Sequence, residues 1–118
     1  KFIHHSITRM CENIGITTEI KVSSNIAIDH LLKSQDKVIA ICEAVDASTY
    51  INPIGGMELY SKDAFTERDL ELKFIKLKPY EYNQFGKDFV PWLSIIDVMM
   101  LNTLDAIRET IDSGYELI

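Results

Sequence analysis

The sequence predicts an α/β fold: one domain over residues 1–118, with a mainly parallel sheet of three or more strands flanked by helices, similar to half of a Rossmann fold. Two observations lead to this prediction. Helical and strand patterns alternate along the chain, which favours parallel strands joined by right-handed crossovers. Hydrophobic residues make up 47% of the 118 residues and charged residues 25%, so the chain can bury one core.

Apolar residues at helical spacing predict the first two helices. The first would end at Gly15, because glycine readily adopts the left-handed conformation that often closes a helix. Its apolar positions are Ile3, Ile7, Met10, Cys11 and Ile14. The second has its apolar residues at i, i+3, i+4 and i+7, namely Val38, Ile41, Cys42 and Val45. Both cysteines lie on these apolar stripes, so we expect structural thiols.

Three stretches have strand character. Residues 16–22 alternate apolar and polar side chains, which predicts a strand with one wet face. Residues 49–51 form a short β-prone run. Residues 70–77 carry apolar side chains on both parities, so this strand is expected to be buried on both faces or to contain a bulge.

Three N-cap candidates predict three more helices. Ser61 would begin a short helix that runs to residue 68. Ser94 and Asp97 have the spacing of a capping box, and the helix that follows is apolar nearly all round, so we expect it to be central. Thr103 would begin a last amphipathic helix that runs to Ile111.

In a parallel sheet, ligands bind beyond the carboxyl ends of the strands, so the loops at 23–25, 52–56 and 78–91 are the candidate ligand segments. Gly55 and Gly56 follow a strand and precede a helix, where exposed backbone N–H groups can bind a phosphate or carboxylate. The alternative is a flexible turn. The glycines lack the spacing of known nucleotide-binding fingerprints, and the sequence indicates no particular cofactor.

The loop at 78–91 mixes aromatic rings with amides around Tyr80, Tyr82 and Gln84. Rings cover the apolar face of a sugar or base while amides meet its hydroxyls, so a ligand site is one interpretation. The other is that the aromatic side chains pin a long loop to the core. Asp97 likewise has two interpretations, a helix cap or an acid–base group with a displaced pKa.

Composition argues against several classes of function. The net charge of −6 disfavours nucleic acid as the main partner, because nucleic acid is bound mainly through Lys and Arg. No apolar run is long enough to span a bilayer, no signal peptide is recognisable, and two cysteines make no disulfide framework, so we expect a cytoplasmic protein. No histidine pair or Cys–His cluster has metal-ligand spacing, so no metal site is expected.

Three segments resemble the WbqC-like family of bacterial proteins. They are Lys-Val-Ile-Ala-Ile-Cys-Glu-Ala at 37–44, Tyr-Ile-Asn-Pro-Ile-Gly-Gly-Met-Glu-Leu-Tyr at 50–60, and the stretch from Tyr82 to Val98 that contains Pro-Trp-Leu-Ser-Ile-Ile-Asp. The resemblance extends over nearly the whole chain. It implies a protein of bacterial surface-polysaccharide (O-antigen) assembly, connected with acyl or aminoacyl modification of a nucleotide-linked amino sugar. Family members are longer, so the chain is expected to be the C-terminal portion of such a protein and to carry part of a site.

Two functions remain open. In a transferase, one group of residues would line the substrate cleft or contact the sugar or its nucleotide, and Asp97 would position the loop or act as a base. That group is Asn52, Gly55, Gly56, Tyr60, Tyr80, Tyr82 and Gln84. In a non-catalytic module, the same loops would dock a glycosyltransferase or another copy of this chain. Convergence of the glycine segment and the aromatic loop on one pocket would favour the first.

Overall fold

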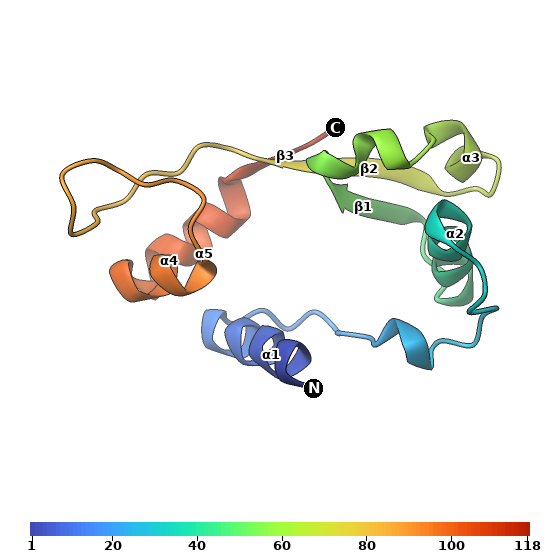
Figure 1. Cartoon of the computed structure of the whole chain (residues 1–118), viewed down its shortest axis with the longest axis horizontal. Coiled ribbons are helices and arrows are strands. Elements are labelled where there is room, and N and C mark those ends of the chain that lie inside the picture. Colours follow the sequence, from blue (N-terminus) through green and yellow to red (C-terminus); the bar gives the residue numbers. More distant parts are fainter. The chain divides into compact units, whose positions relative to one another are not determined.

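The computed structural model describes residues 1–118, and contacts within the chain divide them into two compact units. Unit 1 comprises residues 1–20 and 77–115, and unit 2 comprises residues 21–76 and 116–118. Figure 1 labels the helices and strands of both units.

Unit 2 contains the sheet and the elements around it. The helical elements are η1 (Ser23–Asn25), α2 (Ser34–Ala44), η2 (Ile54–Leu59) and α3 (Lys62–Thr66), and the strands are β1 (Thr49–Pro53), β2 (Glu71–Leu77) and β3 (Tyr115–Leu117), the last two reaching into unit 1 by one residue each. The strand order is β1-β2-β3. Two strands and the helix α3 were thus predicted in the right places.

The sheet is mixed, which corrects the expectation of a mainly parallel, Rossmann-like arrangement. β1 pairs in parallel with β2, in a register that runs from Thr49 opposite Glu71 to Pro53 opposite Ile75 (Figure 1). β3 runs antiparallel to β2, because Phe74 and Ile118 exchange both backbone hydrogen bonds at 2.9 Å. The fold class is α/β with three strands.

The strand predicted at residues 16–22 is wrong. This segment has no regular structure, and its apolar side chains Ile16, Ile20 and Val22 are exposed. Alternation of apolar and polar residues makes a strand only where a neighbouring backbone supplies hydrogen bonds, and none pairs with this segment. The third strand is instead β3, whose three residues are all exposed.

The core of unit 2 lies between α2, α3 and one face of β2. Its buried residues are Ile39, Cys42, Phe65, Leu70, Leu72 and Phe74. β2 has fully buried side chains on one face only, and Leu77 on the other face is exposed. The register of β2 with β1 contains no bulge. On α2 the prediction was half right: Cys42 is buried, but its buried partner is Ile39, whereas Ile41 is only half-buried and Val45 is exposed.

Unit 1 is helical, with α1 (Phe2–Ile14), α4 (Ile95–Leu101) and α5 (Leu104–Ser113). α5 packs against both α1 and α4. Gly15 ends α1 as predicted, with a left-handed φ of 87°. The Arg108 guanidinium on α5 donates to the carbonyl of Ile14 at 2.6 Å and so ties the end of α1 to α5.

The predicted N-caps are confirmed, but the expectation of a central helix after Ser94 is wrong. The hydroxyls of Ser61, Ser94 and Thr103 each accept a hydrogen bond from a backbone N–H of the first helical turn. No residue of α4 is buried, and Met100 is 79% exposed. α4 packs on α5 and contacts the loop before it, and its apolar residues Ile95, Ile96 and Met100 stay exposed. No helix of the chain has both the length and the apolarity that crossing a membrane requires.

Candidate functional site

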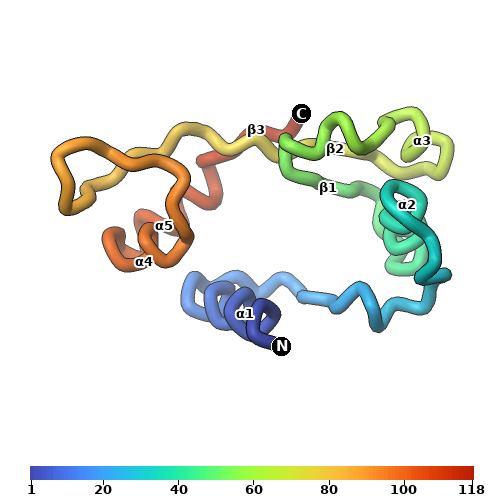
Figure 2. The backbone as a smooth tube through the Cα atoms, in the orientation of Figure 1, coloured from blue at the N-terminus to red at the C-terminus, as the bar shows by residue number.

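The loop between β2 and α4 is held to α4 through Asp97. Figure 2 traces this loop as a long excursion without regular structure, in yellow and orange. The Tyr82 hydroxyl donates to Asp97 Oδ2 at 2.5 Å, and Gln84 Nε2 reaches the same oxygen at 3.4 Å. Asp97 stands in the first turn of α4 at the third position after the cap residue Ser94, but its carboxylate bonds to the loop instead of completing a capping box.

Gln84 also closes the loop on itself. Its Nε2 donates to the Val90 carbonyl at 3.0 Å, and its Oε1 accepts from the Val90 N–H at 2.9 Å. A side-chain amide thereby satisfies both backbone groups of a residue that lies outside any helix or strand. Gln84 therefore fixes the width of the loop between residues 84 and 90.

Three aromatic rings pack in a row inside the loop. The ring centroids of Tyr80 and Tyr82 lie 5.3 Å apart, and Phe89 meets the Tyr82 ring edge-on at 5.3 Å. The Tyr80 hydroxyl donates to Oδ1 of Asn102, the cap residue that follows α4, at 3.0 Å. The hydroxyls of Tyr80 and Tyr82 therefore both attach the loop to α4 and its cap residue. This agrees with the interpretation that the aromatic side chains hold the loop in place.

The hydrogen bond with Asp97 raises the pKa of Tyr82 above its ordinary value, because ionisation would place a phenolate beside a carboxylate. Tyr82 is therefore a protonated hydrogen-bond donor at neutral pH. Both side-chain hydrogen bonds to Asp97 end on Oδ2, and its Oδ1 accepts none within the chain.

The tip of the loop surrounds a hollow of about 310 Å³, here called the loop hollow. Its lining residues are Glu81, Tyr82, Asn83, Gln84, Gly86, Lys87, Asp88 and Phe89. Sequence reasoning selected Tyr82 and Gln84 but missed the others. The missed signal is a set of polar side chains interleaved with the rings: Glu81, Lys87 and Asp88 make no ion pair and no side-chain hydrogen bond within the chain.

A second group of predicted residues lies together in unit 2. The Tyr50 hydroxyl donates to Asn52 Oδ1 at 3.0 Å, and Asn52 Nδ2 donates to the Pro53 carbonyl at 3.3 Å. The Tyr60 ring meets the Tyr50 ring edge-on, with centroids 5.8 Å apart. Burial, and next to it the interaction with Tyr60, raises the pKa of Tyr50 to about 12, so this phenol stays neutral.

The two glycines of this group have different surroundings. Gly56 is buried, and a Cβ at this position would lie 2.0 Å from Asn52 Nδ2. A Cβ on Gly55 would meet nothing within 4 Å. Both lie within η2, whereas α3 begins only at Lys62, so the pair does not form the start of an α-helix as predicted. The missing side chain of Gly56 leaves room for the amide of Asn52, whereas the space beside Gly55 is open.

The predicted site residues thus form two groups, one in each unit. Asn52, Gly56 and Tyr60 are in contact within unit 2, next to Gly55, and the ring-bearing loop with Asp97 belongs to unit 1. In the parallel pair of β1 and β2, Pro53 lies beside Ile75. The chain leaves β1 after Pro53 and continues into the glycine segment, and it leaves β2 after Leu77 and continues into the ring-bearing loop. That the two groups form one site stays a prediction.

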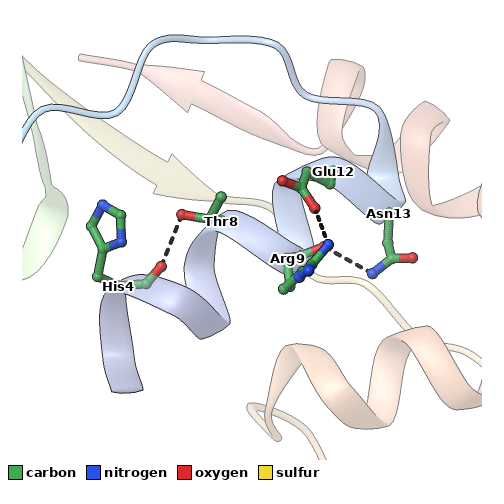
Figure 3. Close-up of polar contacts among 5 residues, drawn as sticks. All are labelled: His4, Thr8, Arg9, Glu12 and Asn13. Carbon is green, nitrogen blue, oxygen red and sulfur yellow. Dashed lines mark hydrogen bonds and ion pairs between the residues drawn. The ribbon is translucent and has the colours of Figure 1, made fainter. Parts of the chain in front are cut away.

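A second hollow, of about 270 Å³, lies beside α1. It is lined by His4, Thr8, Cys11, Glu12, Ile16, Thr17, Thr18 and Ile20. Figure 3 shows that polar groups of α1 bond within the helix: Thr8 donates to the His4 carbonyl, and Arg9 pairs with Glu12. Asn13 in turn donates to the carbonyl of Arg9. The loop hollow, whose charged side chains are unpaired, is therefore the better candidate.

The Cys42 thiol shows no feature of a nucleophile. Cys42 is buried in the core of unit 2, and desolvation raises the pKa of its thiol, which keeps it in the unreactive protonated form. The burial of Cys42 agrees with the structural role that we expected from its position on the apolar stripe of α2.

Comparison with known proteins identifies the family. No curated protein and no solved structure matches the chain. The model of the WbqC-like protein family matches residues 1–109, which is most of the chain and includes the loop, Asp97 and the glycine pair. The chain therefore belongs to the WbqC-like protein family.

Proposed function

We propose that the protein acts in bacterial surface-polysaccharide (O-antigen) biosynthesis, where it binds a nucleotide-linked amino sugar for acyl or aminoacyl transfer to the sugar amine. Support comes from the family and from one observation above all. The loop hollow has a mostly polar lining, in which the rings of Tyr82 and Phe89 stand among unpaired carboxylate, amide and ammonium groups, a mixture that suits a polyol with a small apolar face.

In the proposed reaction the sugar ammonium first gives one proton to Asp97 and becomes a neutral amine. The amine nitrogen then attacks the carbonyl carbon of an activated acyl group, such as a thioester. The C–N bond of the amide forms as the C–S bond breaks, and the thiolate takes the second proton of the nitrogen and leaves as a thiol. Asp97 is the proposed base, because its Oδ1 accepts no hydrogen bond within the chain. Its Oδ2 holds the loop through Tyr82, so one carboxylate would both position the loop and accept the proton.

The binding step is tested by titrating nucleotide-linked amino sugars, and the free nucleotide as a control, into the protein and two variants. Gly55→Val places its side chain in open space, so it leaves folding intact and weakens binding if a ligand approaches there. Glu109→Gln, at an exposed position of α5 outside both groups of site residues, is the control. Equal binding by all three proteins removes the glycine segment from the proposed site.

The transfer step is tested by mass spectrometry after incubation of protein, nucleotide-linked amino sugar and acyl thioester. We expect the mass of the acylated sugar to appear with the wild type and not with Asp97→Asn. Product formed at the same rate by Asp97→Asn would contradict the role of Asp97 as a base.

The second candidate, a non-catalytic module that docks a glycosyltransferase or another copy of this chain, is favoured by one observation. α4 and the residues before it expose apolar side chains, among them Trp92 at 78% and Met100 at 79%. Light scattering of the protein and of Met100→Glu tests self-association. A monomeric wild type excludes the second copy, and a larger particle that dissociates in the variant supports it.

A further inference from the structure

We propose that the loop hollow binds the sugar ring of the substrate in its free-amine, protonated form, and that it discriminates against the N-acylated form. This inference rests on the proposed function, because it specifies which part and which chemical state of the nucleotide-linked sugar the loop holds.

The size of the loop hollow fits one sugar ring. Sites for small molecules occupy about 300–1,000 Å³, and the loop hollow, at about 310 Å³, lies at the lower end of this range. It has room for a monosaccharide unit, and because it is open to solvent, the nucleotide of a linked substrate can extend outside the loop.

Two aromatic rings supply the apolar part of a mostly polar lining, where the apolar face of that sugar ring can pack. Tyr82 and Phe89 both line the loop hollow, with their rings edge to face. The Tyr82 ring is fixed by its hydrogen bond to Asp97 and by its contact with Tyr80. An ordered ring loses little conformational entropy when a ligand packs on it.

The charges around the loop hollow favour a cation over an anion. Two carboxylates, Glu81 and Asp88, line it against one ammonium, Lys87, and none of the three is engaged in an ion pair. The whole chain carries a net charge of −6, which adds to the negative potential. A diphosphate would be repelled here, whereas the ammonium of an amino sugar would be attracted by the carboxylates.

The same charges distinguish substrate from product. Acylation converts the sugar ammonium into a neutral amide, so the product loses its attraction to Glu81 and Asp88. The loop hollow would therefore retain the unmodified sugar and release the acylated one.

Titration calorimetry at pH 6, with glucosamine, N-acetylglucosamine and glucose as probes, tests the inference. At this pH the glucosamine amine is protonated. We expect glucosamine to bind about fivefold or more tightly than the two neutral sugars. The double variant Glu81→Gln, Asp88→Asn should abolish this preference, and Glu109→Gln, which removes an exposed carboxylate of α5, should keep it.

Three results would overturn the inference: equal affinity for the three sugars, a preference that survives in the double variant, or tighter binding of the N-acetylated sugar. A parallel titration with a nucleotide-linked amino sugar separates this failure from failure of the proposed function. If that compound binds with equal affinity to the wild type and the double variant, the sugar is bound elsewhere and only the inference falls. If free glucosamine binds as expected but the linked compound does not, the inference holds and the proposed function fails.

Discussion

Asp97 shows how one residue can join two segments that differ in structure. Its backbone belongs to the first turn of α4, and its Oδ2 accepts hydrogen bonds from Tyr82 and Gln84 of the loop. The sequence predicted that Asp97 matters, through its spacing from Ser94, but not what it bonds to. A capping box is a local pattern, whereas the contact with Tyr82 depends on how the loop folds back over the helix.

The pKa of Tyr82 gives a direct test of this contact. Asp97→Asn removes the negative charge while keeping an oxygen acceptor, so the raised pKa of Tyr82 should fall toward the ordinary value of about 10. Spectrophotometric titration of the tyrosines, with Tyr82→Phe to assign the signal, measures the shift. An unchanged titration curve in Asp97→Asn would mean that the hydrogen bond is not formed in solution.

The same shift predicts how stability depends on pH. The folded pKa of Tyr82 is raised, so the stabilisation from its protonated hydroxyl is fully present below the unfolded tyrosine pKa of about 10 and is lost as the pH rises through the folded value. We expect the stability difference between wild type and Tyr82→Phe to be constant from pH 7 to about pH 9 and to shrink at higher pH. Chemical denaturation at several pH values measures it, and a difference that grows above pH 10 would have the wrong sign.

The two neighbouring glycines of η2 should respond oppositely to an added methyl group. Gly56→Ala displaces the Asn52 amide and breaks its contact with Tyr50, so the free energy of unfolding should fall by about 1–2 kcal/mol. Gly55→Ala meets open space and should change it by less than about 0.5 kcal/mol. Urea denaturation of both variants decides this, and equal losses would show that Gly56 is not packed as described.

At the scale of elements, the sequence predicted what local chemistry determines. Ser61, Ser94 and Thr103 cap helices because a hydroxyl can satisfy an N–H group of the turn that follows. The sequence did not predict which face of a helix the other elements cover. The pattern of α2 placed Ile41 on the buried face, but α3 and β2 cover the side that carries Ile39.

Substitutions on α2 test this assignment. Ile39→Asp introduces an unpaired charge at a position that is 7% exposed, so it should lower the free energy of unfolding by several kcal/mol, about 3 or more. Ile41→Asp, at a half-buried position, should cost clearly less. Circular dichroism during thermal unfolding compares the two, and a larger loss for Ile41→Asp would reverse the buried face of α2.

The cap of α4 is tested in the same way. Ser94→Ala removes the oxygen that accepts the Ile96 N–H at 3.2 Å and should cost about 1 kcal/mol. Ser94→Asp keeps an acceptor at this position and should retain most of the stability. If the alanine variant melts at the wild-type temperature, Ser94 does not stabilise the helix.

At the scale of the whole molecule, contacts between distant segments lay beyond the reach of sequence patterns. Arg108 donates to the carbonyl of Ile14, and β3 pairs with β2 through the last residue of the chain, Ile118. Periodicity describes how a residue relates to its near neighbours, so it predicts elements but not these partners. The alternation of elements predicted a mainly parallel sheet, and β1 does pair in parallel with β2, but the strand order and the antiparallel third strand were not predicted.

The account depends most on the claim that the loop hollow is a ligand site. Amide chemical shifts of the isotope-labelled chain, recorded while a nucleotide-linked amino sugar is added, test this claim most directly. We predict saturable shifts for Asn83, Lys87 and Asp88, accompanied by Gly55 if the two groups of residues form one site. Saturable binding that shifts none of the three loop residues would contradict the account.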